Sequence, residues 1–227
     1  MSPTAEARHL DEELSALRGR LLAMGGMAED LLRTAVEALV ERDDAMAESV
    51  ILGDRELDAM EVELDEICIH LLARHQPVAR DLRLITMVMR ISNDLERVGD
   101  HSVNIAHEVL RLEDAPTLGR FTELDEMARI SREMLSEALD SFVRGDSEAA
   151  QQVCERDDQV DALEDSLFRV LLTHMMEDPR RITPAMSLIL VARNLERVAD
   201  LATNIGEDVV YLVEGRSIKH GAKRRNG

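Results

Sequence analysis

The chain has 227 residues, with 46 Asp or Glu against 27 Lys or Arg, and its formal net charge is −19. This length allows one or two domains, and an apolar content of 45% is typical of a globular protein and not of a disordered acidic chain. Three Phe, one Tyr and no Trp offer few surfaces on which bases could stack, and the acidic charge repels phosphate backbones. We therefore expect no binding to nucleic acid.

The sequence shows neither a membrane-spanning segment nor a secretory signal. The longest uninterrupted apolar stretch, residues 188–192, is far shorter than the roughly 18 residues needed to cross a bilayer. The first eight residues contain no apolar core behind a basic end. Cys68 and Cys154 form no CxxC pair, and we expect them to be reduced, partly buried thiols. These features predict a cytoplasmic protein without direct membrane insertion.

Helix-breaking residues are few, and they divide the chain into six long segments. Each segment is rich in strong helix formers and lacks the alternation of β-branched residues that is typical of strands. The breaks fall at residues 42–44, 75–77, 113–119, 144–146 and 177–179. The sequence therefore predicts an all-α chain of six helices.

The third and sixth segments carry the same heptad seam, 100 positions apart. The two sets are Val88, Ile91, Leu95, Val98, Ser102, Ile105, Val109 and Leu112, and Leu188, Val191, Leu195, Val198, Ala202, Ile205, Val209 and Leu212. Weaker seams recur in the second and fifth segments. This pattern indicates an internal duplication, with two tandem three-helix bundles at residues 9–112 and 120–214 joined by a linker at 113–119.

Residues 215–227 form a basic tail that contains several Lys and Arg. A frayed terminus explains such a tail, and so does a docking arm for an acidic partner.

A polar stripe lies nearly opposite the seam in the third and sixth segments, and we expect it to face outward. Its members are Asn93, Glu96, Asp100, Asn104 and His107, and then Glu196, Asp200, Asn204 and Glu207. Carboxylates one helical turn apart repel each other weakly, and a metal ion that shares their oxygens would compensate. A solvated acidic face, the usual fate of charges opposite an apolar seam, explains the stripe equally well.

The second and fifth segments carry matching acidic rows. Asp54 and Asp58 are followed on the same flank by Glu61 and Asp65, and Asp157 and Asp161 are followed by Glu164. If neighbouring helices bring these rows to the stripes of the third and sixth segments, each half has a carboxylate cluster at its surface.

Familiar enzyme templates do not fit the sequence. A ferritin-like di-iron centre needs Glu-x-x-His on inward-facing helices, and Glu6 to His9 at the start of the chain is the one such spacing. No Gly-rich phosphate loop and no GxGxxG motif is present, and no spacing suggests a catalytic triad. We therefore nominate no catalytic residue and expect a protein that is not an enzyme.

Residues 93–106 and 192–205 resemble the repeated motif of the PhoU family, with Leu-Glu-Arg-Val at 95–98 and again at 195–198. Residues 77–83 also look like that family's loop into its third helix, and the likeness extends from about residue 9 to residue 214. The resemblance implies a cytoplasmic regulator that connects a phosphate ABC transporter to a sensor histidine kinase and restrains the phosphate-starvation response. It also implies two tandem three-helix bundles and a homodimer.

The resemblance further implies surface clusters of iron or zinc held by E(D)xxxD motifs. The motif matches four pairs: Asp54 and Asp58, Glu96 and Asp100, Asp157 and Asp161, and Glu196 and Asp200. The family would place Glu at position 107, where this chain has His107, whereas the matching position in the second half has the expected Glu207. This difference leaves open whether both halves bind the same metal. A His nitrogen would favour zinc or iron over magnesium.

Two other functions remain open at this point. The carboxylate clusters could activate water in a metal-dependent hydrolase. The chain could also be a purely structural bundle whose acidic residues keep it in solution.

Overall fold

The computed structural model describes residues 5–112 and 115–218, and within these ranges the chain is helical with no strand. Its elements are α1 (Ala5–Glu41), α2 (Asp44–His75), α3 (Ala79–Arg111), α4 (Thr122–Arg144), α5 (Ser147–Cys154), α6 (Asp157–Glu177), η1 (Pro179–Arg181) and α7 (Ile182–Glu214). The predicted all-α fold is confirmed. Part of the expected linker, residues 113–114, and most of the expected tail, residues 219–227, lie outside the described residues.

The helices end where the sequence places its breaks, and local side chains explain why. The Asp43 carboxylate accepts a hydrogen bond from the backbone N–H of Met46 at 3.0 Å and so caps the start of α2. Asp146 does the same for α5, and Gly145, with φ of 63°, ends α4 in the left-handed conformation that glycine tolerates. These short-range signals separate the long segments.

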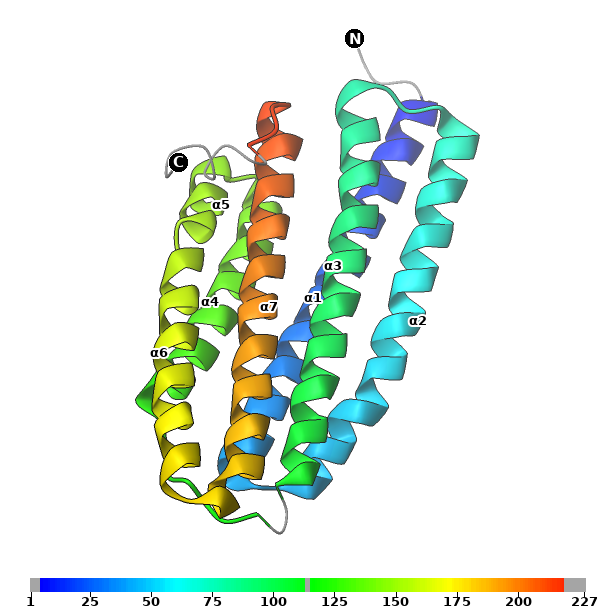
Figure 1. Ribbon diagram of the computed structural model, residues 1–227. Coiled ribbons are helices and arrows are strands. Elements are labelled where there is room, and N and C mark those ends of the chain that lie inside the picture. Colours follow the sequence, from blue (N-terminus) through cyan, green and yellow to red (C-terminus); the bar gives the residue numbers. More distant parts are fainter. Residues whose placement is uncertain (1–4, 113–114, 219–227) are drawn as a thin grey trace.

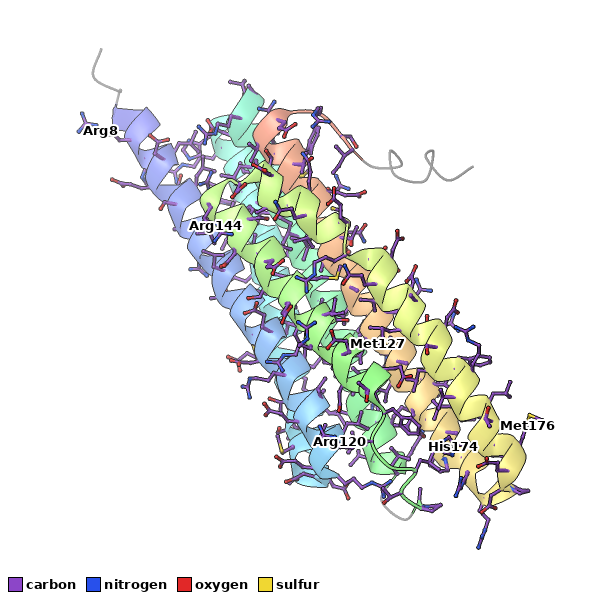
Figure 2. The ribbon with its side chains drawn as sticks, turned by 90° about the vertical axis from the view of Figure 1, so that its left-hand side faces the viewer. Arg8, Arg120, Met127, Arg144, His174 and Met176 are labelled. Atoms are coloured by element: carbon purple, nitrogen blue, oxygen red, sulfur yellow. The ribbon has the colours of Figure 1, made fainter. Side chains whose placement is uncertain are left out.

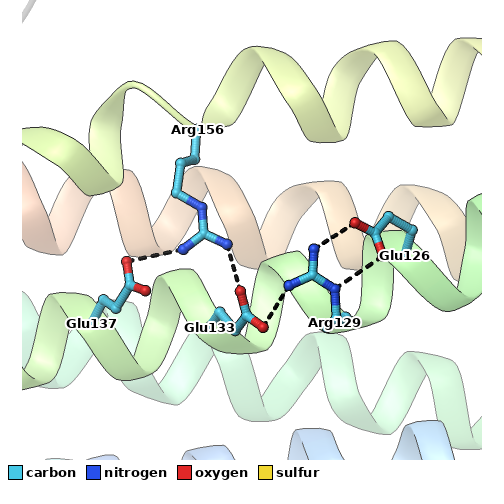
Figure 3. Close-up of polar contacts among 5 residues, drawn as sticks. All are labelled: Glu126, Arg129, Glu133, Glu137 and Arg156. Carbon is cyan, nitrogen blue, oxygen red and sulfur yellow. Dashed lines mark hydrogen bonds and ion pairs between the residues drawn. The ribbon is translucent and has the colours of Figure 1, made fainter.

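The fifth predicted segment is divided in two, because α5 ends at Cys154 and α6 begins at Asp157. Arg156, at this break, donates hydrogen bonds to Glu137 at 2.9 Å and to Glu133 at 2.7 Å, both on α4. Glu133 also accepts a hydrogen bond from Arg129, which in turn contacts Glu126 (Figure 3). Ion pairs therefore fasten the break to α4.

The two halves pack against each other through α3 and α7, which run antiparallel along the middle of the molecule (Figure 1). The helices α1 to α3 form one half, α4 to α7 form the other, and α1 also touches α4. Viewed from the side, the body is elongated, with Arg8 toward one end and Met176 at the other (Figure 2). No helix in the described ranges is both long enough and apolar enough to cross a membrane.

The predicted seams form the core. All eight residues of the first seam, which runs along α3 to Leu112, are buried, as are seven of the eight in α7, and Leu212 is half-buried. Polar contacts also join the halves: the His101 ring and the Asn194 side chain lie 2.9 Å apart, and Arg90 Nε lies 3.2 Å from an oxygen of Asp208. The core thus continues from one half into the other and leaves the polar stripes outside.

Candidate functional site

The eight acidic residues of the motif stand on two pairs of adjacent helices. On α2 and α3 lie Asp54, Asp58, Glu96 and Asp100, which we call the first acidic group. On α6 and α7 lie Asp157, Asp161, Glu196 and Asp200, which we call the second acidic group. Each of these side chains is half-buried or exposed, so both groups lie at the surface as the sequence predicts.

In the first acidic group, a glycine allows α2 and α3 to approach closely. A Cβ atom at position 99 would lie 2.5 Å from Asp54 Oδ1 and also 2.5 Å from the Leu57 side chain, so only glycine fits there without a shift. Asp54 Oδ1 is consequently buried against α3 and has no hydrogen-bond partner among the described residues. Burial, together with the negative charges of Asp58 and Asp100, raises the pKa of Asp54 to about 6.

Glu96 belongs to the same electrostatic unit. Its pKa is raised by burial first and then by the charges of Asp100 and Asp58, the second of which comes from the neighbouring helix. Glu61 contributes to this repulsion as well. The structure therefore brings all four members of the first acidic group together, and it adds Glu61 to them.

The second acidic group is gathered less completely. Burial first, and then the charges of Asp200, Glu164 and Asp161, raise the pKa of Glu196 to about 7, while the charge of Arg197 opposes this shift. Asp157 lies at the other end of the group, where it acts on the Cys154 thiol. Burial is the main cause that raises the pKa of this thiol to about 12, and Glu207 and Asp157 add to it.

The arginine of the repeated motif behaves differently in the two halves. Arg197 contacts an oxygen of Glu196 at 3.4 Å and donates a hydrogen bond to Asp200 at 3.0 Å. Its counterpart Arg97 lies 3.6 Å from an oxygen of Asp94 instead. Part of the negative charge of the second acidic group is thus neutralised within the chain.

The donor chemistry of both groups suits a cation, because carboxylate oxygens bind iron, zinc and hard divalent ions. The buried, unpartnered Asp54 oxygen and the mutual repulsion of the carboxylates fit a positive ligand at the first acidic group. Across the described ranges, however, no three His, Cys, Asp or Glu side chains are arranged so that they could hold a metal ion. The side chains would have to turn toward a shared ion, for which their partial exposure leaves room.

Other residues near these groups differ from the matched pairs. His107 is exposed on α3, whereas Glu207, its counterpart on α7, is half-buried and acts on Cys154. Both Cys68 and Cys154 are free thiols. The place of Cys154 beside Glu207 could not be found from its spacing, because α5 and α7 bring these two residues together from distant positions.

The PhoU domain profile matches this chain twice, at residues 21–109 and 124–209. The chain belongs to the PhoU family. Curated relatives cover nearly the full chain: a protein of Pseudomonas putida is 40% identical over 220 residues, 96% of this chain and 86% of that protein. One from Rhizobium meliloti is 43% identical over 206 residues, covering 90% and 87% of the two chains. Both are named phosphate-specific transport system accessory protein PhoU homolog.

Solved structures confirm the PhoU-like fold. The crystal structure of PhoU from Pseudomonas aeruginosa superposes with a TM-score of 0.88 at 40% sequence identity, covering 91% of this chain and 99% of that one. The phosphate transport system regulatory protein PhoU from Streptococcus pneumoniae gives a TM-score of 0.86 at 30% identity, covering 92% and 99%. The family predicted from the Leu-Glu-Arg-Val repeats is thereby confirmed.

Proposed function

We propose that this PhoU family member is a cytoplasmic adaptor that couples a phosphate ABC transporter to a sensor histidine kinase. In this role it restrains the phosphate-starvation response when phosphate is plentiful. The match of the PhoU domain in both halves carries the proposal, since relatives that cover nearly the whole chain are named as accessory and regulatory proteins of phosphate transport. The chain acts by binding partners and not by catalysis, with residues 9–112 and 120–214 as its two units, and it works as a homodimer.

Affinity capture tests the adaptor function. The tagged chain is expressed in cells grown with high or low phosphate, and the captured proteins are identified by mass spectrometry. We expect a phosphate transporter component and a sensor histidine kinase to be enriched over an unrelated acidic helical protein. Capture of neither under either condition would contradict the proposal.

We further propose that each acidic group holds iron or zinc. Asp54, Asp58, Glu96 and Asp100 would supply oxygen ligands in the first half, and Asp157, Asp161, Glu196 and Asp200 in the second. A bound cation would neutralise the repulsion that raises the pKa of Asp54 and Glu196. The charge on Arg197 leads us to expect tighter binding in the first half.

Metal analysis tests this second proposal. The chain and its double variant Asp100→Asn with Asp200→Asn are purified, loaded with iron or zinc and desalted, and the metal content per chain is measured. We expect the double variant to lose most of its metal. A matched control, Glu56→Gln with Asp158→Asn, changes exposed acids on α2 and α6 outside the motif pairs and should retain it. Equal metal content in the two double variants would contradict the assignment.

A phosphatase and phosphodiesterase screen on the metal-loaded chain separates the adaptor from the alternative, a metal-dependent hydrolase. We expect no turnover that follows metal content. Turnover that is lost with Asp100→Asn and Asp200→Asn would favour the hydrolase instead.

A further inference from the structure

The outer face of the hairpin formed by α6 and α7 carries a strip of exposed apolar side chains. Three come from each helix, four residues apart, and their exposed fractions range from 36% to 81%. They are Phe168, Leu172 and Met176 on α6, and Ile182, Met186 and Leu190 on α7. The short turn η1 joins the two helices, so the rows run antiparallel and start level at the hairpin end, where Met176 points away from the body (Figure 2). We call these six residues the apolar strip.

The duplication provides an internal reference for the strip. Positions 103 earlier on α2 and 100 earlier on α3 occupy the same places in the first half. They hold Asp65, Ile69, Ala73, Leu82, Thr86 and Arg90. Only Ile69 and Leu82 are large and apolar there, yet the first half forms the same three-helix packing. The apolar strip is therefore not required for the fold, and a contiguous exposed apolar surface of this kind marks an interaction site.

The charges around the strip indicate what covers it. At the hairpin end, Arg180 pairs with Asp178 at 2.9 Å and Arg181 with Glu177 at 3.2 Å, so this end is internally neutralised. At the other end, carboxylates outnumber guanidinium groups: Asp157, Asp158, Asp161, Glu164, Asp165, Glu196 and Asp200 stand against Arg169, Arg193 and Arg197. Electrostatic complementarity favours a partner with basic residues.

We propose that the apolar strip binds an amphipathic helix of another protein, with its apolar side toward Leu172 and Met186 and basic residues over the acidic end. Two packed helices present a groove in which a third helix can lie, and apolar side chains three and four residues apart on that helix would fill it. This inference rests on the adaptor function proposed above and names one of its binding faces. It does not require a metal ion.

The experiment uses the full chain and a fluorescein-labelled helical peptide of 16 residues, with Leu on one side and Lys at both ends. Binding is measured by fluorescence anisotropy. We expect the double variant Leu172→Gln with Met186→Gln to bind the peptide at least about tenfold more weakly, since it removes apolar contacts at the centre of the strip. The matched control, Ile69→Gln with Leu82→Gln, changes exposed apolar residues in the first half and should bind as the unaltered chain does. Circular dichroism and thermal unfolding establish that both variants are folded.

Two further peptides test the chemistry of the partner. A scrambled peptide, in which the Leu residues no longer share a side, should lose binding, and a peptide with Glu in place of Lys should bind more weakly. Equal binding of all three peptides, or an equal loss in both double variants, would overturn the proposal. So would a dimer that the strip variant converts to a monomer without peptide binding, because a second copy would then cover the strip. If the peptide fails to bind while transporter and kinase proteins are still captured from cells, the strip assignment is wrong and the adaptor function stands.

Discussion

The two halves of the chain differ most where α2 runs unbroken and its counterpart is divided into α5 and α6. Gly53 lies within α2, and a Cβ atom there would come within 2.9 Å of the Leu31 side chain on α1. The corresponding position, 103 residues later, holds Arg156, which lies at the break and reaches carboxylates on α4. In one half a glycine lets a continuous helix pack closely, and in the other a long charged side chain fastens a broken helix. One position in a duplicated sequence thus changes how the same three-helix bundle is held.

The first prediction concerns a close contact between α5 and α7 in the second half. Gly206 on α7 faces the backbone carbonyl of Ala150, and a Cβ atom would lie 2.8 Å from that oxygen. The first half has a buried alanine, Ala106, at the matching position. Because a backbone atom cannot move aside cheaply, Gly206→Ala should lower the free energy of unfolding by about 2–3 kcal/mol, measured by urea unfolding.

Gly19→Ala serves as the control for this substitution. Gly19 lies within α1 and no atom is within 4 Å of its potential Cβ, so alanine should stabilise the chain by up to about 1 kcal/mol through helix propensity. If both substitutions stabilise the chain, the close approach of α5 and α7 is wrong.

The second prediction concerns the ion pair between the two halves, where the residue of the first half is replaced by its counterpart from the second half. Arg90 pairs with Asp208, which is only 1% exposed, whereas the position that matches Arg90 is Leu190. Arg90→Leu removes a positive charge from a buried carboxylate and should lower the free energy of unfolding by about 2 kcal/mol. Thermal unfolding measures the loss. Adding Asp208→Asn to Arg90→Leu should restore part of the lost stability, because the carboxylate is then no longer left without its positive partner. If the two substitutions instead lower the free energy of unfolding additively, the pairing is contradicted.

The helices and seams could be predicted because their signals are local. Asp43 starts a helix and Gly145 ends one through contacts with residues close to them in sequence. The two seams that contain Val98 and Val198 follow from helical spacing alone. The break at Arg156 could not be predicted, since Glu155 and Arg156 are ordinary helix formers and the ion pairs that hold the break come from α4.

The candidate site was predictable to a similar depth. Spacing identifies Glu96 and Asp100 as neighbours on one side of a helix, and in the structure the charge of Asp58 on the adjacent helix contributes to the raised pKa of Glu96. The partners of the motif arginines also follow a difference in the sequence. Arg97 has a carboxylate three residues earlier, Asp94, and contacts it, whereas the matching position before Arg197 holds Asn194 and Arg197 contacts Asp200 instead.

The third prediction tests the break between α5 and α6. Arg156→Ala removes the contacts to Glu133 and Glu137 and should lower the free energy of unfolding by about 1 kcal/mol, because these ion pairs are partly exposed. Chemical denaturation measures the change. Arg55→Ala, at an exposed position on the unbroken α2, should alter stability by less than about 0.5 kcal/mol. An equal effect of the two would show that the ion pairs do not hold the break.

The smallest expected effect is a pH dependence of stability that differs between the two acidic groups. The pKa of Asp54 is raised from 3.8 to about 6 and that of Glu196 from 4.5 to about 7, so the folded chain holds these protons more tightly than the unfolded chain. Their stabilising contribution is therefore present at low pH and is lost as pH rises through these values, by under about 1 kcal/mol each because both groups are partly exposed. Urea unfolding of the chelator-treated chain between about pH 4 and pH 8 should show this decline. Asp54→Asn should remove the part of the decline at lower pH and Glu196→Gln the part at higher pH, because the pKa of Glu196 is the higher of the two. A decline that neither variant alters would mean that groups other than Asp54 and Glu196 cause it.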